Sequence, residues 1–180
     1  MRYADYYDCD ICNGNAVGMS LFVQGCPLHC DGCFNPETWN FEGGKEWTAE
    51  TKQKFIELAG RNYIQRISIL GGSPLCDENV VEVFHLVREL KAKYPMKEIW
   101  VYTGYTWETI WSKVTTDDLY SYVYKEARQD TIRLCNVLVD GPFEYDKKNL
   151  SLAFRGSSNQ RIIDVQKSLK EGRVVLWKSK

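Results

Sequence analysis

Short apolar runs and longer amphipathic stretches alternate along this chain. Residues 77–94 carry apolar side chains at helical spacing, with Asp77 placed to cap the helix and Pro95 just after its end. Residues 48–59 show a similar pattern, with Thr48 as the candidate N-cap. The pattern therefore predicts two amphipathic helices that bury one face each.

Four short runs between these helices have the composition of buried strands. They are residues 18–23, 66–70, 98–102 and 136–139, and turn residues follow each of the last three. Strands that alternate with helices predict βαβ units and a mostly parallel sheet of the α/β class. In such sheets ligands collect at the carboxyl ends of the strands.

The pattern is less regular elsewhere. The stretch before the fourth strand is predicted to be a surface segment. Residues 117–118 can cap a helix there that runs to about residue 128. Near the C-terminus, residues 161–165 and 173–177 are predicted either as edge strands or as a tail.

Composition limits the classes of function. The chain has 180 residues, 44% of them hydrophobic, and a net charge of −1, which fits one domain spanning residues 1–180. The near-neutral charge gives no electrostatic basis for binding nucleic acid or an anionic membrane, and no apolar run is long enough to span a membrane. Seven cysteines without a signal segment are expected to be the reduced thiols of a cytoplasmic protein.

Three of these cysteines lie within eight residues, directly after the first predicted strand: Cys26, Cys30 and Cys33. Their spacing puts three thiolates on one tight loop, and thiolates bind iron–sulfur clusters, zinc and Cu(I). A complete cluster or a structural zinc site normally takes four protein ligands, so three local cysteines suggest one coordination position left open for chemistry. From the residues alone, a zinc loop or a set of disulfide-forming thiols remains the alternative.

With its neighbours, the triplet resembles the radical S-adenosylmethionine (radical SAM) enzymes. The Gly32-Cys33-Phe34-Asn35 segment is similar to that of the small activating enzymes of this superfamily. The resemblance implies a partial, open (β/α) barrel in which the three cysteines hold a [4Fe-4S] cluster and SAM binds the fourth iron. It also implies that Gly32, Cys33 and Phe34 border the cofactor.

A second motif follows the next predicted strand, Gly71-Gly72-Ser73-Pro74, where the superfamily carries a Gly-Gly-Glu-Pro type sequence. Glycines at a strand end let backbone groups approach a ligand closely. Ser73 replaces the usual acidic residue, and a hydroxyl binds the SAM ammonium group less strongly than a carboxylate does. The resemblance therefore implies SAM contacts along this motif, with weaker binding than is usual.

Thr103 and Gly104 follow the third predicted strand and are further candidate SAM contacts. Thr103 can equally be the N-cap of a short helix that starts near Trp107.

Two later segments narrow the resemblance: residues 136–143 (NVLVDGPF) and 154–161 (FRGSSNQR). With Asn13-Gly14 and residues 33–39, they resemble the activating proteins of anaerobic (class III) ribonucleoside-triphosphate reductases, over most of the chain. The implied activity is reductive cleavage of SAM at the cluster and formation of a glycyl radical on the reductase. A flavodoxin-like or other low-potential electron donor is implied as a further partner. The Arg155–Gln160 run is predicted either to face the partner or shape the mouth of the site, or to be a structural loop.

Other interpretations of the function stay open at this point. The chain can activate another glycyl radical enzyme, such as pyruvate formate-lyase, or serve as an iron–sulfur electron-transfer module without SAM chemistry. Cys9 and Cys12 form a lone C-x2-C pair, a weak signal for a second metal site. Cys76 and Cys135 are expected to be incidental thiols.

Overall fold

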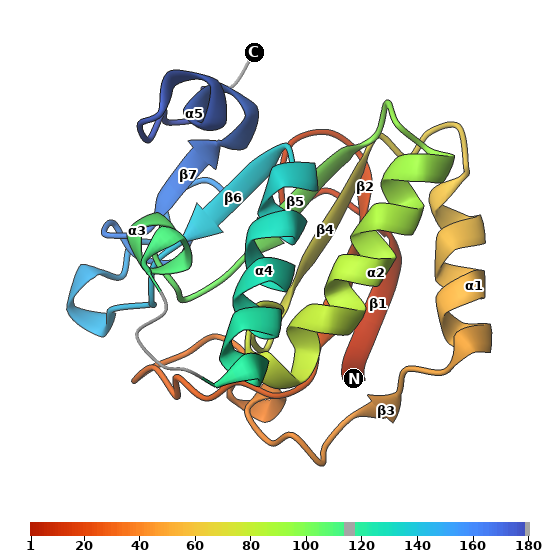
Figure 1. Ribbon diagram of the computed structural model, residues 1–180, viewed down its shortest axis with the longest axis horizontal. Helices are drawn as coiled ribbons and strands as arrows, with labels where there is room; N and C mark the ends of the chain where they lie inside the picture. Colours follow the sequence, from red (N-terminus) through yellow and green to blue (C-terminus); the bar gives the residue numbers. More distant parts are fainter. Residues whose placement is uncertain (114–117, 179–180) are drawn as a thin grey trace.

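The β-strands form one open sheet, which Figure 1 shows behind a layer of long helices. The computed structural model describes residues 1–113 and 118–178. Across the sheet the strands follow the order β3-β1-β2-β4-β5-β6-β7, so β3 and β7 form its two edges and the sheet does not close. The strand bounds are Arg2–Asp10 (β1), Gly18–Val23 (β2), Lys45–Glu46 (β3), Arg66–Gly71 (β4), Glu98–Tyr102 (β5), Val137–Asp140 (β6) and Arg161–Asp164 (β7).

The central strands run parallel, as the sequence predicts. β2 pairs with β4, β4 with β5 and β5 with β6, all in parallel register. These strands agree with the four predicted runs to within one residue at each end. The α/β class and the open sheet are therefore confirmed, whereas a barrel of the radical SAM type stays a prediction.

Antiparallel strands flank this parallel core on both sides and make the sheet mixed. β1 pairs antiparallel with β2 and with β3, and β7 pairs antiparallel with β6. β7 is the predicted edge strand, whereas residues 173–177 contribute only an isolated bridge between Leu176 and Ile163. β1 is absent from the sequence prediction because its sequence, RYADYYDCD, is rich in Asp, a residue depleted in strands.

Helices α1, α2 and α4 lie side by side over one face of the sheet (Figure 1). Their bounds are Ala49–Ala59 (α1), Asp77–Lys93 (α2) and Leu119–Leu134 (α4); the shorter helices are Trp107–Trp111 (α3) and Val165–Glu171 (α5), with 3-10 turns at Pro36–Thr38 (η1) and Tyr145–Lys147 (η2). No helix within the described residues is long and apolar enough to cross a membrane.

The capping residues agree only in part with the prediction. Thr48 caps α1 by accepting a hydrogen bond from the amide of Thr51, as predicted. Asp77 is not the cap of α2, because the helix starts at Asp77 itself and Cys76 holds the N-cap position without a side-chain bond. Asp118 caps α4, and Asp117, the other predicted cap, lies outside the described residues.

The central strands bury side chains on both of their faces, because successive residues point to opposite sides. Leu21 and Ile69 belong to the main core, which includes buried side chains of α1 and α2. Trp100 and Val139 belong to a separate cluster, against which Trp177 packs. Helices therefore cover one face of the sheet, and irregular segments cover part of the other face.

Arg66, the first residue of β4, anchors one of these irregular segments. Its side chain is 1% exposed and donates to the carboxylate (3.2 Å) and the carbonyl (2.9 Å) of Asp10. The same guanidinium donates to the carbonyls of Asn13 (2.8 Å) and Asn15 (2.9 Å). Gly14 has a φ of +134°, and a Cβ there would lie 2.6 Å from Arg66 Cδ. This buried network holds the loop between β1 and β2 against the sheet.

The pKa of Asp10 reflects this network. Burial alone would raise it, but hydrogen bonds from Ser20 and from the Cys12 amide, together with Arg66, hold it below its ordinary value of 3.8. A carboxyl group whose pKa is lowered by folding stabilises the fold above its ordinary pKa, and that contribution is lost as pH falls through the lowered value. Asp10 therefore contributes to acid sensitivity below about pH 4.

Replacing Asp10 tests the weight of this network. Asp10→Asn leaves the Arg66 charge buried without a counter-charge, and we expect the free energy of unfolding in urea at pH 7 to fall by about 3–5 kcal/mol. The difference between parent and variant should narrow as the pH drops below 3.8. The matched control is Asp8→Asn on the same strand, whose ion pair with Arg61 is exposed and should contribute less than about 1 kcal/mol. Equal effects of the two substitutions would contradict the assignment.

Candidate metal and cofactor site

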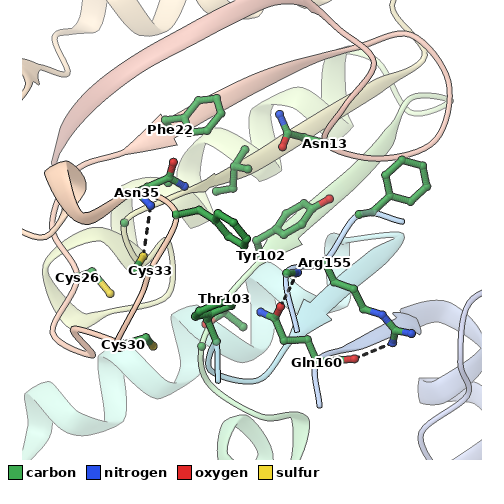
Figure 2. A pocket seen from close by; sticks show the side chains of 18 of the residues that line it. Asn13, Phe22, Cys26, Cys30, Cys33, Asn35, Tyr102, Thr103, Arg155 and Gln160 are labelled. Carbon is green, nitrogen blue, oxygen red and sulfur yellow. Dashed lines mark hydrogen bonds between the residues drawn. The ribbon is translucent and has the colours of Figure 1, made fainter. Parts of the chain in front are cut away.

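A pocket of about 740 Å³ lies at the carboxyl ends of the parallel strands. Figure 2 shows the three cysteines of the triplet at one end of this pocket and Arg155 at the other. Gly71 and Gly72 after β4, and Thr103 and Gly104 after β5, line the strand ends between them. Residues that the sequence separates by more than 70 positions therefore meet in one place, where the parallel sheet was expected to gather ligands.

Backbone hydrogen bonds join the start of the cysteine loop to the segment that follows the loop. The amide of Gly25 donates to the carbonyl of Thr38 (2.8 Å), and the amide of Cys26 donates to that of Trp39 (3.1 Å). The buried Gln24 side chain donates to the carbonyls of Glu37 (2.9 Å) and Asn40 (2.7 Å). The ends of the loop are thus fixed by contacts that do not involve the cysteine side chains.

The histidine of the cysteine loop packs against this same segment. The ring of His29 stacks on Trp39 with 4.8 Å between the ring centroids. His29 also has a φ of +44°, an uncommon left-handed conformation for a residue with a side chain. The backbone turn that separates Cys26 from Cys30 therefore passes through His29.

The three thiols differ in their surroundings. Cys26 is buried, whereas Cys30 and Cys33 are partly exposed. Burial raises the pKa of the Cys26 thiol, bonds from the amides of Leu28 and His29 oppose that rise, and the two neighbouring thiols add to it. Cys33 Sγ accepts a hydrogen bond from the amide of Asn35 at 3.4 Å.

The thiols do not converge on a single point in this conformation. Within residues 1–113 and 118–178, no three side chains of His, Cys, Asp or Glu are arranged to hold a metal ion together. Each cysteine side chain turns about one torsion between staggered positions, so the sulfur positions differ from one rotamer to another. Three thiols on one loop, with amides already directed at two of the sulfurs, fit a cluster tuned by N–H···S bonds.

Gly71 and Gly72 approach the cysteine loop as well as the pocket. The amide of Gly72 donates to the carbonyl of Val23, and the amide of Ser73 donates to that of Gly25, both at 2.8 Å. A Cβ on Gly72 would lie 2.4 Å from the Gly25 carbonyl oxygen, and Gly71 has a φ of +103°. Close packing of two backbones therefore requires this glycine pair, independently of any ligand.

Not every predicted SAM contact borders the pocket. Gly71, Gly72, Thr103, Gly104, Cys33 and Phe34 line it, whereas Gly32, Ser73 and Pro74 do not. Ser73 is 1% exposed and its hydroxyl has no hydrogen-bond partner among the described residues. For all nine residues the predicted contact with SAM stays a prediction.

The two residues after β5 have separate local roles. The hydroxyl of Thr103 accepts a bond from the amide of Tyr105 (3.2 Å), and α3 is capped by Thr106. The alternative prediction, that Thr103 caps this helix, is therefore wrong, because the N-cap is Thr106. A Cβ on Gly104 would lie 2.1 Å from Leu28 Cδ1, so this glycine makes room for the cysteine loop.

The Arg155–Gln160 run forms the wall opposite the cysteines as a self-bonded loop. The side-chain oxygen of Gln160 accepts from the amides of Gly156 (2.9 Å) and Ser157 (3.2 Å), and Arg155 donates to the Gln160 carbonyl (2.7 Å). Asn159 donates to the carbonyl of Pro142 at 2.8 Å. The side chains thus satisfy backbone groups, which favours the structural interpretation of this run.

Arg161 ties this wall to the strand ends. It donates to both carboxylate oxygens of Asp140 (3.0 and 2.5 Å), which is 1% exposed, and to both oxygens of Glu108 (3.0 and 2.7 Å). The amide of Trp107 adds a third bond to Asp140 at 2.7 Å. The ion pairs raise the pKa of Arg161 and lower that of Glu108, so these two groups stay charged at neutral pH.

Sequence reasoning missed part of the pocket. Tyr7 and Tyr102 also line it, although neither lies in a recognisable motif, and so does Cys12 of the C-x2-C pair. Cys76 and Cys135 lie elsewhere and are buried, and burial raises the pKa of Cys76 to about 12. Only the alternation of side chains along β5, which puts Tyr102 on the face opposite Val101, could have indicated Tyr102.

Comparison with known proteins agrees with this geometry. Residues 12–163 match the model of a family described as a 4Fe-4S single cluster domain, which makes this an α/β protein of the iron–sulfur class. A 162-residue region is 41% identical to the anaerobic ribonucleoside-triphosphate reductase-activating protein of Salmonella typhi, covering 89% of this chain and 96% of that protein. The proteins of the same name from Escherichia coli K12 and from Enterobacteria phage T4 are 40% and 34% identical, over 89% and 90% of this chain and 96% and 93% of their own lengths. The chain belongs to this family of reductase-activating proteins.

Substitution of Gly72 tests whether the glycine pair positions the cysteine loop. In Gly72→Ala the new methyl group meets the Gly25 backbone, and we expect a loss of about 1–3 kcal/mol in stability together with reduced iron binding after anaerobic reconstitution. The control is Gly172→Ala, where no atom lies within 4 Å of the added Cβ and only the positive φ is strained. Undiminished iron binding in Gly72→Ala would contradict this role.

Tyr102 offers a second test, because its hydroxyl is buried without a partner among the described residues. Burial raises the pKa of this phenol, so the group stays neutral. An unsatisfied buried polar group costs about 1–3 kcal/mol, so Tyr102→Phe should raise the free energy of unfolding by about 1 kcal/mol or more. Chemical denaturation measures the change, and a destabilised variant would show that the hydroxyl has a bonding partner.

Proposed function

We propose that this protein is a radical SAM activating enzyme, an oxidoreductase that generates a glycyl radical on an anaerobic ribonucleoside-triphosphate reductase. The proposal requires that it reductively cleaves SAM at a [4Fe-4S] cluster held by Cys26, Cys30 and Cys33. The observation that carries it is the meeting of this cysteine loop with the glycine pair after β4 in one pocket. The relatives' name supplies the identity of the protein substrate.

The bound cluster and SAM would together supply a one-electron reductive cleavage whose carbon-centred product removes a hydrogen atom from a glycine of the reductase. The chain's own residues would position the cluster and SAM and tune their electronic properties. Burial raises the pKa of Cys26, and the amides of Leu28 and His29 oppose that rise. The amide of Asn35 donates to Cys33 Sγ. Gly71 and Gly72 offer a surface free of side chains beside the cysteines, where a ligand's polar groups can approach the backbone.

The lining of the pocket suits a reaction that moves hydrogen atoms rather than protons. Arg155 is the only Lys, Arg, Asp or Glu side chain among the lining residues, and its guanidinium is bonded to the Gln160 carbonyl. Figure 2 shows it pointing away from the cysteines. Among the described lining residues no His, Lys, Asp or Glu side chain borders the cysteines, and the proposed reaction needs none.

The open sheet supports a protein as the substrate. Because β3 and β7 do not pair, the strand ends and the loops after them border a mouth that a segment of another chain can enter. Reduction of the cluster requires an electron from outside this chain, and a flavodoxin-like or other low-potential protein is the proposed donor.

The decisive experiment follows both products of the proposed reaction. Anaerobically reconstituted protein, reduced with dithionite and supplied with SAM, should release 5′-deoxyadenosine and methionine. With the reductase present, a glycyl radical should appear in the electron paramagnetic resonance (EPR) spectrum. Cys30→Ala is expected to abolish both products, because two of the triplet's cysteines cannot hold the cluster with one open iron.

The other outcomes separate the alternatives. A radical on pyruvate formate-lyase but not on the reductase would reassign the protein substrate. A reducible cluster that releases no 5′-deoxyadenosine even with the reductase present would favour electron transfer without SAM chemistry.

A further inference from the structure

Four exposed apolar side chains gather at the pocket that holds the cysteines. Leu28 and Phe34 belong to the cysteine loop and are 37% and 51% exposed. Tyr145 and Leu150 belong to the segment after β6 and are 57% and 81% exposed. Exposed apolar side chains are ordinary when scattered, but a group at the edge of one pocket marks an interaction site. We call these four residues the apolar rim.

The cysteine loop and the segment after β6, which carry the two halves of the rim, contact each other through neighbouring residues. The ring of Phe34 meets that of Phe143 edge to face, with 5.1 Å between the centroids. The ring of Tyr145 lies so close to Gly32 that a Cβ there would be 2.4 Å from Tyr145 Cδ2. The rim is therefore continuous from the cysteine loop to the segment after β6, and its members hold defined positions.

Leu150 sits at the tip of a turn that is built to hold it outward. The amide of Leu152 donates to the Asn149 carbonyl (3.3 Å), and the amide of Ser151 donates to the Asn149 side chain (2.9 Å). The Asn149 amide in turn donates to the carbonyl of Gly156 (3.1 Å), which fixes the turn to the loop behind it. Turn tips usually carry polar residues or glycine, so a leucine held there by three hydrogen bonds is a preformed anchor.

The exposure of the apolar side chains at the pocket edge favours a protein segment as the occupant of the rim. Leu28, Phe34 and Leu150 line the pocket and at the same time reach its exposed edge. A chain that enters toward the cysteines must pass these side chains. Interfaces concentrate their binding energy in a few apolar anchors of this kind near the centre of the contact.

We infer that the apolar rim is the docking surface for the reductase, and that Leu150 is its main anchor. The occupant is a loop of the reductase with the target glycine at its tip and apolar side chains beside it. The glycine passes between Leu28 and Leu150 toward the cysteines, and the flanking side chains pack on the rim. This inference rests on the proposed function for the identity of the partner.

Substitution at Leu150 separates docking from chemistry. We expect Leu150→Ser to weaken the affinity of the reconstituted protein for the reductase about tenfold or more, measured anaerobically by biolayer interferometry. The half-saturating concentration of reductase for the glycyl radical EPR signal should rise by the same factor. Iron bound after anaerobic reconstitution should stay at the parent level, because Leu150 lies outside the cysteine loop.

Two controls accompany this variant. Leu150→Met keeps an apolar anchor at the turn tip and should retain the parent affinity within about twofold. Met96→Ser removes an apolar side chain that is 92% exposed and lies outside the pocket lining, and it should leave the affinity unchanged.

Three results would overturn the docking assignment. The first is an affinity of Leu150→Ser within twofold of the parent. The second is an equal loss of 5′-deoxyadenosine release without the reductase, which would make Leu150 part of the cofactor wall. The third is a difference in sedimentation between Leu150→Ser and the parent without the reductase. Such a difference would make the rim an interface between copies of the activating protein. Absence of 5′-deoxyadenosine from the parent would overturn the proposed function instead, and the affinity comparison would still decide the docking site.

Discussion

The site depends on two backbone hydrogen bonds between the end of β4 and the start of the cysteine loop. The amides of Gly72 and Ser73 bind the carbonyls of Val23 and Gly25, and this extends the parallel pairing of β2 and β4 beyond the strands themselves. The bonds require the two backbones to approach more closely than any side chain allows, since a Cβ on Gly72 would overlap Gly25. The cysteine loop that starts there lines one pocket with the residues that follow β5 and β6.

Polar groups outside the cysteine loop give the opposite wall its shape. Asp140 ends β6, and Arg161 begins β7, so their ion pair joins adjacent antiparallel strands at the edge of the pocket. The Arg155–Gln160 loop is then bonded to itself and to the carbonyls of residues 141 and 142. A buried charge without a partner destabilises the folded protein. Separation of these paired groups would therefore be unfavourable, and the wall keeps one arrangement. A rigid wall on one side and a fixed cysteine loop on the other leave a pocket whose mouth carries the apolar rim.

Local signals predicted those elements whose causes are local. The four parallel strands, the cap at Thr48 and the edge strand after Gln160 follow from composition and periodicity within a few residues. β1 escaped prediction because its aspartates carry out tertiary roles: Asp10 neutralises the buried Arg66, and Asp8 pairs with Arg61. Cys76 replaced the expected Asp77 at the N-cap of α2 because the strand-end turn sets where the helix begins, and helix ends are the least determined part of a periodic pattern.

The sequence alone determined that three thiols share one loop, because Cys26, Cys30 and Cys33 fall within eight residues. It also determined where that loop lies, since turn residues after successive parallel strands must share one edge of a sheet. Tertiary structure decided what the remaining motif residues do. The glycine pair packs on the cysteine loop, Gly104 makes room for Leu28, and the Arg155–Gln160 run closes a wall. These roles arise from distances of closest approach between segments far apart in the chain, which residue type and spacing do not specify.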